Sequence, residues 1–554
     1  MDKIHRCSRW IANEVQNEAI FIAALCVMNI PLIENLWSNA SAWVLIRSGV
    51  VQGLKNFALL VLIAVLLRRF PRCVKRFFEA AAIIMSAVML MLNQFAFQTL
   101  GGMLNIGMAE ALLATTTHEA LEFLEAYLTA HTVICLFLFI VIVFLGGVFL
   151  YRILKKSARY PLATLTCLAV GLASFIQCTI KNPEIFVDEL SIGQGIRVFY
   201  QAYRVLGDHE NVLVKMRAYR PEITHNKGEA QYIVYILGES GSRHRMGIYG
   251  YHLDTTPRMG KRLEDGKLYV FTDVVSPHSQ TIEVLKKLYT FHRTGLDGEW
   301  MDYGNLFSIL RAAGYHTAWL SNQEYSGKYG NVARCYAELC DEMHFTVIAD
   351  REDNLPRGKD EQVLPFLDEM LAKAGKEKCF AVIHLMGEHC TYKDRYPDVY
   401  SKFNENDEMG KEKRTQAEYD NAVLYNDTVV DEIIQRFEDK DAIIVYAPDH
   451  GEEVCEEGDY FGHYEGRGTR YMMEIPMVVW TSSIFKEKHA ELEKRIAAAV
   501  QRPYMTDDMI HTLMDLAGVE TPEYDAGKSI INASFDAGRP RWFAGKLYVN
   551  GTFR

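Results

Sequence analysis

One uninterrupted apolar run, residues 132–150, restricts the folds that are open to this chain. Its sequence, TVICLFLFIVIVFLGGVFL, contains no charged side chain. About 20 helical residues are needed to cross the hydrocarbon core of a bilayer, and this run comes close to that length. Because a helix that is apolar on every face does not suit the surface of a soluble domain, the run predicts a membrane-spanning helix.

Four further apolar runs precede or follow this one, so we expect five spans in all. Pro31 interrupts the first run and Lys55 lies in the second, and for these two a re-entrant or interfacial helix is the alternative. The first run also lacks a small-residue cleavage site, which argues against a signal peptide. The four runs are residues 19–33, 50–67, 80–97 and 162–180.

Basic side chains indicate the orientation of the spans. Lys and Arg gather before the first run, in 68–76 and in 152–159, whereas 34–43 and 98–127 contain neither. Because cytoplasmic loops are enriched in Lys and Arg, the N-terminus is expected in the cytoplasm. After an odd number of crossings, everything beyond residue 181 is then expected on the outer side of the membrane.

The rest of the chain is typical of a charged, soluble domain. Over the whole chain, 70 acidic residues outnumber 59 basic ones, and the net charge of −11 disfavours a nucleic-acid partner. From residue 231 short β-rich runs alternate with charged helical segments, which predicts an α/β domain with a mainly parallel sheet. The runs are residues 232–237, 269–274, 317–320, 380–385, 442–447 and 476–481.

These patterns divide the chain into three parts. We expect a transmembrane domain at 1–181, an interfacial or linker segment at 182–230 and a catalytic domain at 231–554. The start of the middle part mixes aromatic, aliphatic and charged residues, so it is either an amphipathic connector on the membrane surface or an ordinary linker helix. In the outer domain, Cys335 and Cys340 are close enough in sequence to form a local disulfide in an oxidising compartment.

Acidic residues and histidines follow several predicted strands, at the edge where open parallel sheets bind ligands. Glu239 follows YIVYILG, and Asp449 and His450 follow AIIVYAP. A carboxylate and an imidazole in one tight turn suit zinc or manganese. Each residue alone has a structural explanation, but together the clusters predict a metal-dependent hydrolase or transferase. A third cluster, HLMGEHCTY, offers His384 and His389, and a fourth offers His463 ahead of the run that begins near Pro476.

The motifs GES, YGY and TTP between residues 238 and 257, HLMGEH from 384 and PDHGE from 448 resemble the alkaline phosphatase and sulfatase superfamily. With the N-terminal spans, the chain resembles the bacterial phosphoethanolamine transferases that modify lipopolysaccharide. The resemblance implies an alkaline-phosphatase-like α/β sandwich behind a five-helix membrane bundle, in the inner membrane, with the catalytic domain in the periplasm. The C-x-P-x-R signature of sulfatases is absent, which argues against sulfatase activity.

The resemblance also implies a zinc site and a nucleophile. The residues alone leave the nucleophile open among Ser276, Ser279 and Thr281. A hydroxyl before the helical run IEVLKKLYTF would present its oxygen where helix amides stabilise a phosphoryl group, but an ordinary helix cap explains it equally well. The family pattern favours Thr281, with Ser279 as the alternative. The implied zinc ligands are Glu239, Thr281, Asp449 and His450.

Contacts to the substrate are implied in the same way. His389 and His463 match histidines that contact the transferred phosphoryl group or a second zinc bound during turnover, and His384 is expected to orient its neighbours. Asn322 and Lys328 resemble the segment that binds phosphoethanolamine. Glu110, in the acidic outer loop, is either a contact for the ethanolamine ammonium or part of a solvated helix face.

The sequence therefore predicts a zinc-dependent transfer of phosphoethanolamine from phosphatidylethanolamine to lipid A or a core sugar of lipopolysaccharide. A covalent threonine intermediate would form, and diacylglycerol would leave. The sequence HYEGRGTRY around His463 departs from the lipid A-modifying branch and leaves the acceptor open. Alternatives are a glycerophosphate transferase or phosphodiesterase that takes another phospholipid, and an inactive membrane sensor.

Overall fold

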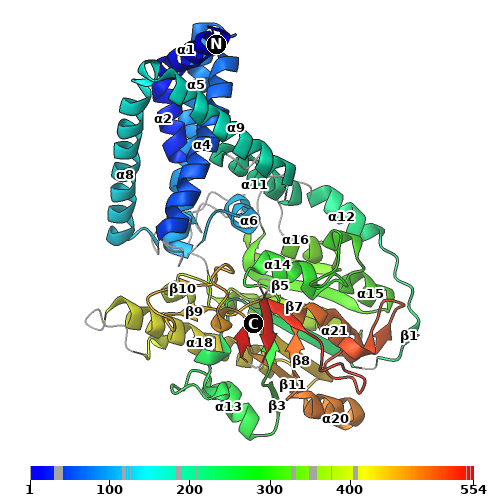
Figure 1. The fold of residues 1–554 in the computed structure, drawn as a ribbon. Coiled ribbons are helices and arrows are strands. Elements are labelled where there is room, and N and C mark those ends of the chain that lie inside the picture. Colours follow the sequence, from blue (N-terminus) through cyan, green and yellow to red (C-terminus); the bar gives the residue numbers. More distant parts are fainter. Residues whose placement is uncertain are drawn as a thin grey trace. The chain divides into compact units, whose positions relative to one another are not determined.

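The computed structural model of this chain contains two compact units (Figure 1). The first, the helical unit, comprises Met1–Leu112 and Tyr127–Val205; the second, the α/β unit, comprises Leu113–Ala126 and Leu206–Arg554. The structure describes residues 2–29, 42–100, 102–114, 120–121, 123–124, 127–181, 190–206, 209–228, 230–325, 332–348, 358–375, 377–403, 410–543, 546–549 and 551–553.

Long apolar helices make up the helical unit. Its described residues include four stretches that are long and apolar enough to cross a membrane: Ile46–Leu67, Arg72–Thr99, Ala130–Arg159 and Pro161–Ile180. This confirms the expected helical membrane domain. The helices are α1 (Asp2–Asn17), α2 (Ala19–Met28), α4 (Ala42–Leu67), α5 (Arg72–Leu100), α6 (Ile106–Ala114), α8 (Ala130–Leu154), α9 (Pro161–Lys181) and α11 (Ser191–Leu206).

Within the described residues, a fifth span is found only if α1 and α2 are counted as one, and the two helices meet at an angle of 75°. α1 is amphipathic: Val15 is buried, whereas Ile4 and Trp10 are exposed together with basic side chains. The sequence pattern predicted the apolar α2 and missed α1, because a half-polar helix before a span has no long apolar run.

α11 occupies the C-terminal part of the segment that was expected to be amphipathic. It buries Val198 and Ala202 and exposes Ile196, Tyr200 and Tyr203. Its exposed side chains therefore combine apolar, aromatic and basic groups, since Arg204 is exposed as well, and this mixture is typical of an interfacial helix. The preceding residues, 182–189, lie outside the described part of the chain.

A mixed seven-stranded sheet organises the α/β unit, in the order β3-β11-β8-β2-β7-β5-β6. The five strands from β8 to β6 are parallel, and β11 is antiparallel to both β8 and β3. The mainly parallel sheet predicted from sequence is confirmed, and β6 is a strand that the sequence pattern missed. The bounds are β2 Tyr232–Gly238, β3 Leu268–Phe271, β5 His316–Tyr325, β6 Glu342–Ile348, β7 Cys379–His384, β8 Ala442–Pro448 and β11 Met477–Thr481.

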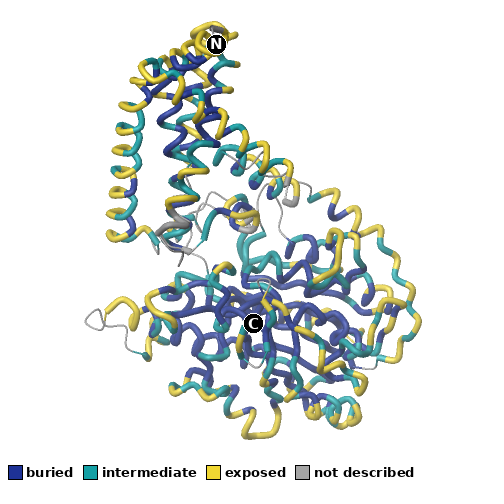
Figure 2. Tube along the Cα trace, viewed as in Figure 1, coloured by how far each residue is buried: buried dark blue, intermediate teal, exposed yellow. Residues whose placement is uncertain are grey.

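The central strand β2 is buried along its whole length, as Figure 2 shows for the middle of the sheet. Successive side chains of a strand point to opposite faces, so β2 contributes to two hydrophobic cores. Ile233 and Tyr235 belong to the core with α14, α15 and α21, and Val234 and Ile236 to the core with α13, α17 and α18. These helices are α13 (Pro257–Glu264), α14 (Thr281–Leu288), α15 (Leu306–Ala312), α17 (Leu364–Ala374), α18 (Lys411–Gln435) and α21 (Met509–Ala517).

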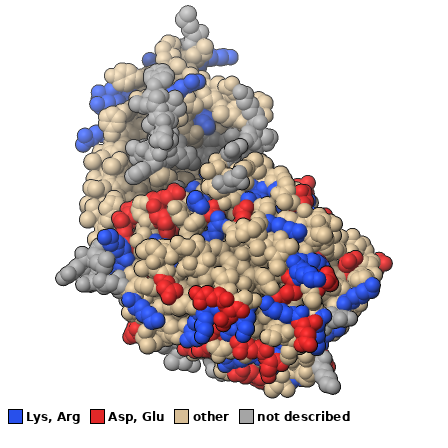
Figure 3. Space-filling model, turned by 90° about the horizontal axis from the view of Figure 1, so that it is seen from below, with Lys and Arg blue, Asp and Glu red and all other residues tan. Residues whose placement is uncertain are grey.

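Smaller elements complete the unit. Acidic and basic side chains are interspersed over the face of the molecule in Figure 3. The remaining helices are α12 (His209–Ala218), α16 (Val332–Ala337), α19 (Ser483–Lys488) and α20 (Ala490–Ala499). The remaining strands are β1 (His225–Asn226), β4 (Val274–Val275), β9 (Glu453–Val454), β10 (Phe461–Gly462), β12 (Tyr504–Met505), β13 (Val519–Glu520), β14 (Arg541–Phe543), β15 (Lys546–Val549) and β16 (Thr552–Phe553).

The local disulfide that the sequence allowed between Cys335 and Cys340 is not formed, because both are free thiols. Cys335 Sγ lies 3.3 Å from Nδ1 of His209, and Cys340 Sγ donates to the carbonyl oxygen of Tyr336 at 3.4 Å. Each thiol therefore has a different neighbour. Burial raises the pKa of the Cys335 thiol to about 12, so it stays protonated at neutral pH.

Candidate metal centre and nucleophile

Residues from three segments meet beyond the carboxyl ends of the parallel strands. Glu239 follows β2, and Asp449 and His450 follow β8, the strand next to β2 in the sheet. The two strands are parallel and in register to their last residues, so the side chains that follow them are brought together. Thr281 comes from outside the sheet as the first residue of α14.

The four side chains lie within a few ångströms of one another and form what we call the metal cluster: Glu239, Thr281, Asp449 and His450. Oγ1 of Thr281 lies 3.3 and 3.2 Å from the two carboxylate oxygens of Glu239 and 3.4 Å from Nε2 of His450. That Nε2 is 3.3 Å from Oε1 of Glu239 and also from Oδ2 of Asp449. The cluster therefore brings two carboxylates, an imidazole and a hydroxyl to one point.

The chemistry of the metal cluster fits a zinc ion. Nδ1 of His450 donates to the carbonyl oxygen of Gly451 at 2.9 Å, an arrangement that leaves Nε2 free as a ligand atom. Oδ2 of Asp449 is buried and accepts no hydrogen bond from the described residues. Burial and the nearby charge of Glu239 raise the pKa of Asp449. A cation between the carboxylates would relieve both effects, and nitrogen and oxygen donors of this kind are common zinc ligands.

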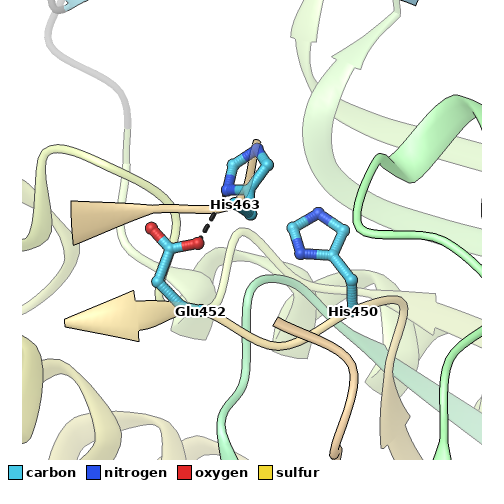
Figure 4. Close-up of side chains that lie close together, drawn as sticks. All are labelled: His450, Glu452 and His463. Atoms are coloured by element: carbon cyan, nitrogen blue, oxygen red, sulfur yellow. Dashed lines mark hydrogen bonds and ion pairs between the residues drawn. The ribbon is translucent and has the colours of Figure 1, made fainter. Parts of the chain in front are cut away.

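A second group of side chains adjoins the metal cluster (Figure 4). The buried carboxylate of Glu452 accepts hydrogen bonds from the Tyr392 hydroxyl at 2.5 Å and, through Oε2, from Nδ1 of His463 at 2.7 Å. The rings of His450 and His463 have centroids 4.3 Å apart. The sequence-based prediction included His463 and missed Glu452, although the run PDHGEE placed an acidic residue two positions after His450.

The other predicted histidines lie nearby in different surroundings. The ring centroid of His389 is 6.4 Å from that of His463, and its Nδ1 lies 2.6 Å from the carbonyl oxygen of Cys390. His384 ends β7 in the interior, with Nδ1 3.4 Å from Oγ of Ser321. Burial lowers the pKa of His384 to about 4, so its imidazole is neutral at physiological pH.

The predicted phosphoethanolamine-binding segment is described only in part. The amide of Asn322 donates to Asp360 at 2.8 Å and accepts from the Thr346 hydroxyl at 2.7 Å, within a buried network. The next residue, Gln323, donates instead to Oε2 of Glu239 at 3.2 Å. Adjacent residues of a strand face opposite ways, which explains why Gln323 rather than Asn322 reaches the metal cluster.

Two of the predicted substrate contacts cannot be placed in the structure. Lys328 lies outside the described residues, as does the side chain of Glu110 on α6. The two serines near Thr281 both donate to main-chain carbonyls: Ser279 to that of His463 at 2.6 Å, and Ser276 to that of His278 at 2.7 Å. Of the three candidate hydroxyls, that of Thr281 lies in the metal cluster.

A close approach of two backbones shapes the site and gives a first prediction. Gly387 has φ +52, and a β-carbon there would lie 2.7 Å from the oxygen and 2.8 Å from the nitrogen of Glu239. We expect Gly387→Ala to displace Glu239 and to lower the melting temperature strongly. Gly266→Ala is the control, because Gly266 also has positive φ (+67) but has open space around it. The free energy of unfolding of Gly266→Ala should fall only by the cost of placing a β-carbon in a left-handed conformation, about 1–2 kcal/mol. Equal decreases in the melting temperatures of Gly387→Ala and Gly266→Ala would contradict the steric explanation.

The hydroxyl of Tyr392 gives a second prediction. Glu452 is fully buried, so loss of one donor in Tyr392→Phe should lower the free energy of unfolding by about 1.5–3 kcal/mol, the usual range for hydrogen bonds to charged groups. Tyr400→Phe is the matched control, since no hydrogen bond from this hydroxyl to the described residues is found, and it should change little. Chemical denaturation of both variants measures the free energy of unfolding. An unchanged value for Tyr392→Phe would show that the hydrogen bond to Glu452 contributes little.

Comparisons with known proteins identify the family of this chain. Residues 231–519 match the protein family described as Sulfatase. The phosphoethanolamine transferase EptC of Escherichia coli (strain K12) is 28% identical over 464 residues, which cover 79% of each chain.

Two solved structures are also similar. The zinc complex of the C-terminal periplasmic domain of EptC from Escherichia coli is 30% identical, with a TM-score of 0.55 over 61% of this chain and 96% of that one. The integral membrane lipooligosaccharide phosphoethanolamine transferase A of Neisseria meningitidis shares the fold, with a TM-score of 0.63 and 20% identity over 94% of this chain and 98% of its own. This chain therefore belongs to the sulfatase family, and its relatives there include bacterial phosphoethanolamine transferases.

Proposed function

We propose that this protein is a zinc-dependent transferase that moves phosphoethanolamine from phosphatidylethanolamine to a lipopolysaccharide acceptor. One observation carries the proposal: the Thr281 hydroxyl lies 3.2–3.4 Å from Glu239 and His450, beside Asp449. The names of the relatives supply the transferred group. We further propose an inner-membrane location, with residues 231–554 in the periplasm as the catalytic domain and membrane lipids at hand as substrates.

The proposed reaction has two half-steps at Thr281. A bound zinc ion supplies Lewis acidity and offsets negative charge at the attacked phosphate. Oγ of Thr281 forms a bond to the donor phosphorus while the bond from phosphorus to the diacylglycerol oxygen breaks. The threonine proton is lost, and the departing diacylglycerol oxygen gains one. An oxygen of the acceptor then displaces Thr281, and the threonine hydroxyl is restored.

The residues around Thr281 suit this chemistry. Thr281 begins α14, where main-chain N–H groups and the helix dipole favour an anionic phosphoryl group. His463 is held through Nδ1 by Glu452, and as an imidazolium it would donate from Nε2 to a phosphoryl oxygen or to the leaving alcohol. We propose His389, Asn322 and Lys328 as further contacts to the phosphoethanolamine, and Glu110 as a contact to its ammonium.

Labelled lipids test the proposal directly. The full chain, purified in detergent with zinc, is incubated with phosphatidylethanolamine or with phosphatidylglycerol, and diacylglycerol is measured. We expect release from phosphatidylethanolamine and, without acceptor, a mass increase of one phosphoethanolamine on the peptide that contains Thr281. Release from phosphatidylglycerol alone would identify a glycerophosphate transferase instead. Mass spectrometry of lipopolysaccharide fragments from cells with and without the protein would then locate the acceptor.

A further inference from the structure

Ser240 lies between the two carboxylates of the metal cluster and hydrogen-bonds to both. Its main-chain N–H donates to Oδ1 of Asp449 at 3.2 Å, and its hydroxyl donates to Oε1 of Glu239 at 3.1 Å. The residue is fully buried, so water does not compete for these bonds. A single residue therefore restrains two side chains that follow different strands.

The backbone of Ser240 makes this double contact geometrically feasible. Its φ is 58°, a left-handed conformation that among the described non-glycine residues is otherwise adopted by Cys455. The chain turns sharply directly after Glu239, so that the N–H of Ser240 faces Asp449 while its side chain stays beside Glu239. For a residue with a β-carbon this conformation costs about 1–2 kcal/mol.

A tyrosine from a neighbouring helix holds the strained turn. The Tyr419 hydroxyl, on α18, donates to the carbonyl oxygen of Ser240 at 2.7 Å and accepts from the N–H of Ser242 at 2.8 Å. Tyr419 is itself fully buried. Strain of this kind persists where surrounding contacts over-determine the backbone, and here the strain falls at a proposed metal site.

The hydroxyl is what distinguishes serine from glycine at this position. Glycine would adopt the same φ at almost no cost. Oε2 of Glu239 accepts from Gln323 at 3.2 Å, so with Ser240 on Oε1 each oxygen of this carboxylate accepts a hydrogen bond from a residue outside the metal cluster. With both oxygens engaged, Glu239 cannot rotate freely about its last torsion.

We propose that Ser240 is a positioning residue that sets the orientation of Glu239 and Asp449 toward the bound cation. The inference rests on the proposed zinc-dependent function and adds a residue that determines how tightly the ion is held. Hydrogen bonds behind metal ligands typically change metal affinity by about 10–100-fold when they are removed.

Zinc affinity of the full chain in detergent is the measurement. Zinc is removed with a chelator, and rebinding is followed in competition with a chromophoric zinc indicator. Asp449→Ala defines the background from sites outside the metal cluster. We expect Ser240→Ala and Ser240→Gly both to bind zinc about 10-fold more weakly than the wild type. Wild-type affinity in both variants would overturn the proposal.

The two variants separate the hydroxyl from the backbone strain. Alanine keeps the β-carbon and its conformational cost, whereas glycine removes both, so glycine is also the variant expected to fold if alanine does not. Weaker binding in only one of two folded variants would assign the effect to the backbone and overturn the role of the hydroxyl. Melting temperatures without zinc accompany each measurement and should stay close to the wild type for Ser240→Gly.

Cys455→Gly is the matched control, because it relaxes the same kind of φ at a residue that is not in the metal cluster. Its zinc affinity should equal that of the wild type, and a loss there would overturn the assignment to Ser240. If the wild type binds no zinc above the Asp449→Ala background, the proposed function fails and this inference with it. If the wild type binds zinc and the Ser240 variants bind it equally well, only the inference fails.

Discussion

Thr281→Ala is expected to abolish turnover of phosphatidylethanolamine, with a loss on the order of 10³-fold or more, the scale seen when a catalytic nucleophile is removed. The physical reason is that no other candidate hydroxyl lies in the metal cluster: Ser279 and Ser276 donate to main-chain carbonyls. Diacylglycerol release from labelled donor, by the full chain in detergent, is the measurement. Intact-mass analysis should also show no phosphoethanolamine adduct on the variant.

Two comparisons make this prediction specific. Thr281→Ser keeps a hydroxyl at the start of α14 and should retain part of the activity and the adduct. Ser279→Ala removes the alternative nucleophile and should leave the adduct in place, at most with a moderate loss from its lost bond to His463. An adduct that persists in Thr281→Ala and disappears in Ser279→Ala would transfer the role to Ser279.

Removal of the metal should have an effect of similar size. Dialysis against a chelator is expected to eliminate activity of the wild type, and added zinc should restore it. Asp449→Ala should be inactive with or without added zinc, because it removes a buried carboxylate whose Oδ2 has no donor among the described residues. Activity and zinc content are measured on the same samples.

The control replaces a carboxylate that lies away from the metal cluster. Asp368 is half-exposed and pairs with Arg436 at 2.8 Å. Exposed ion pairs contribute little, about 0–1 kcal/mol, so Asp368→Ala should keep its zinc and its activity. Full activity of the wild type after the zinc has demonstrably been removed would contradict the metal-dependent proposal.

The sequence was informative about the metal cluster because its strands are parallel neighbours. Glu239 and Asp449 each follow a continuous apolar run, and strands of that type end at one edge of the sheet, so their proximity could be inferred without coordinates. β6 was missed because it lies at the edge of the sheet and its side chains are half-exposed, so its sequence, EMHFTVI, has no continuous apolar run.

Side-chain direction was harder to predict than strand position. Whether Asn322 or Gln323 reaches Glu239 depends on the phase of β5, and the end of this strand, SNQEY, has no alternation of apolar and polar residues that would reveal that phase. Glu452 was missed for a related reason: its role depends on Tyr392 and His463, which are distant in sequence. The bend between α1 and α2 lies at a polar stretch that an apolar-run criterion does not register.

The burial of β2 in two cores has a consequence for the motions of the site. Amides in such a strand exchange with solvent only when most of the domain unfolds, and its neighbour β8 is buried to the same extent. Glu239 and Asp449 are attached directly to these two strands and share their rigidity. Thr281 and His463 are carried by shorter elements, the first residue of α14 and the residue that follows β10. The two carboxylates of the metal cluster are thus held by the part of the domain that opens last, so we expect their spacing to persist through local openings elsewhere in the domain.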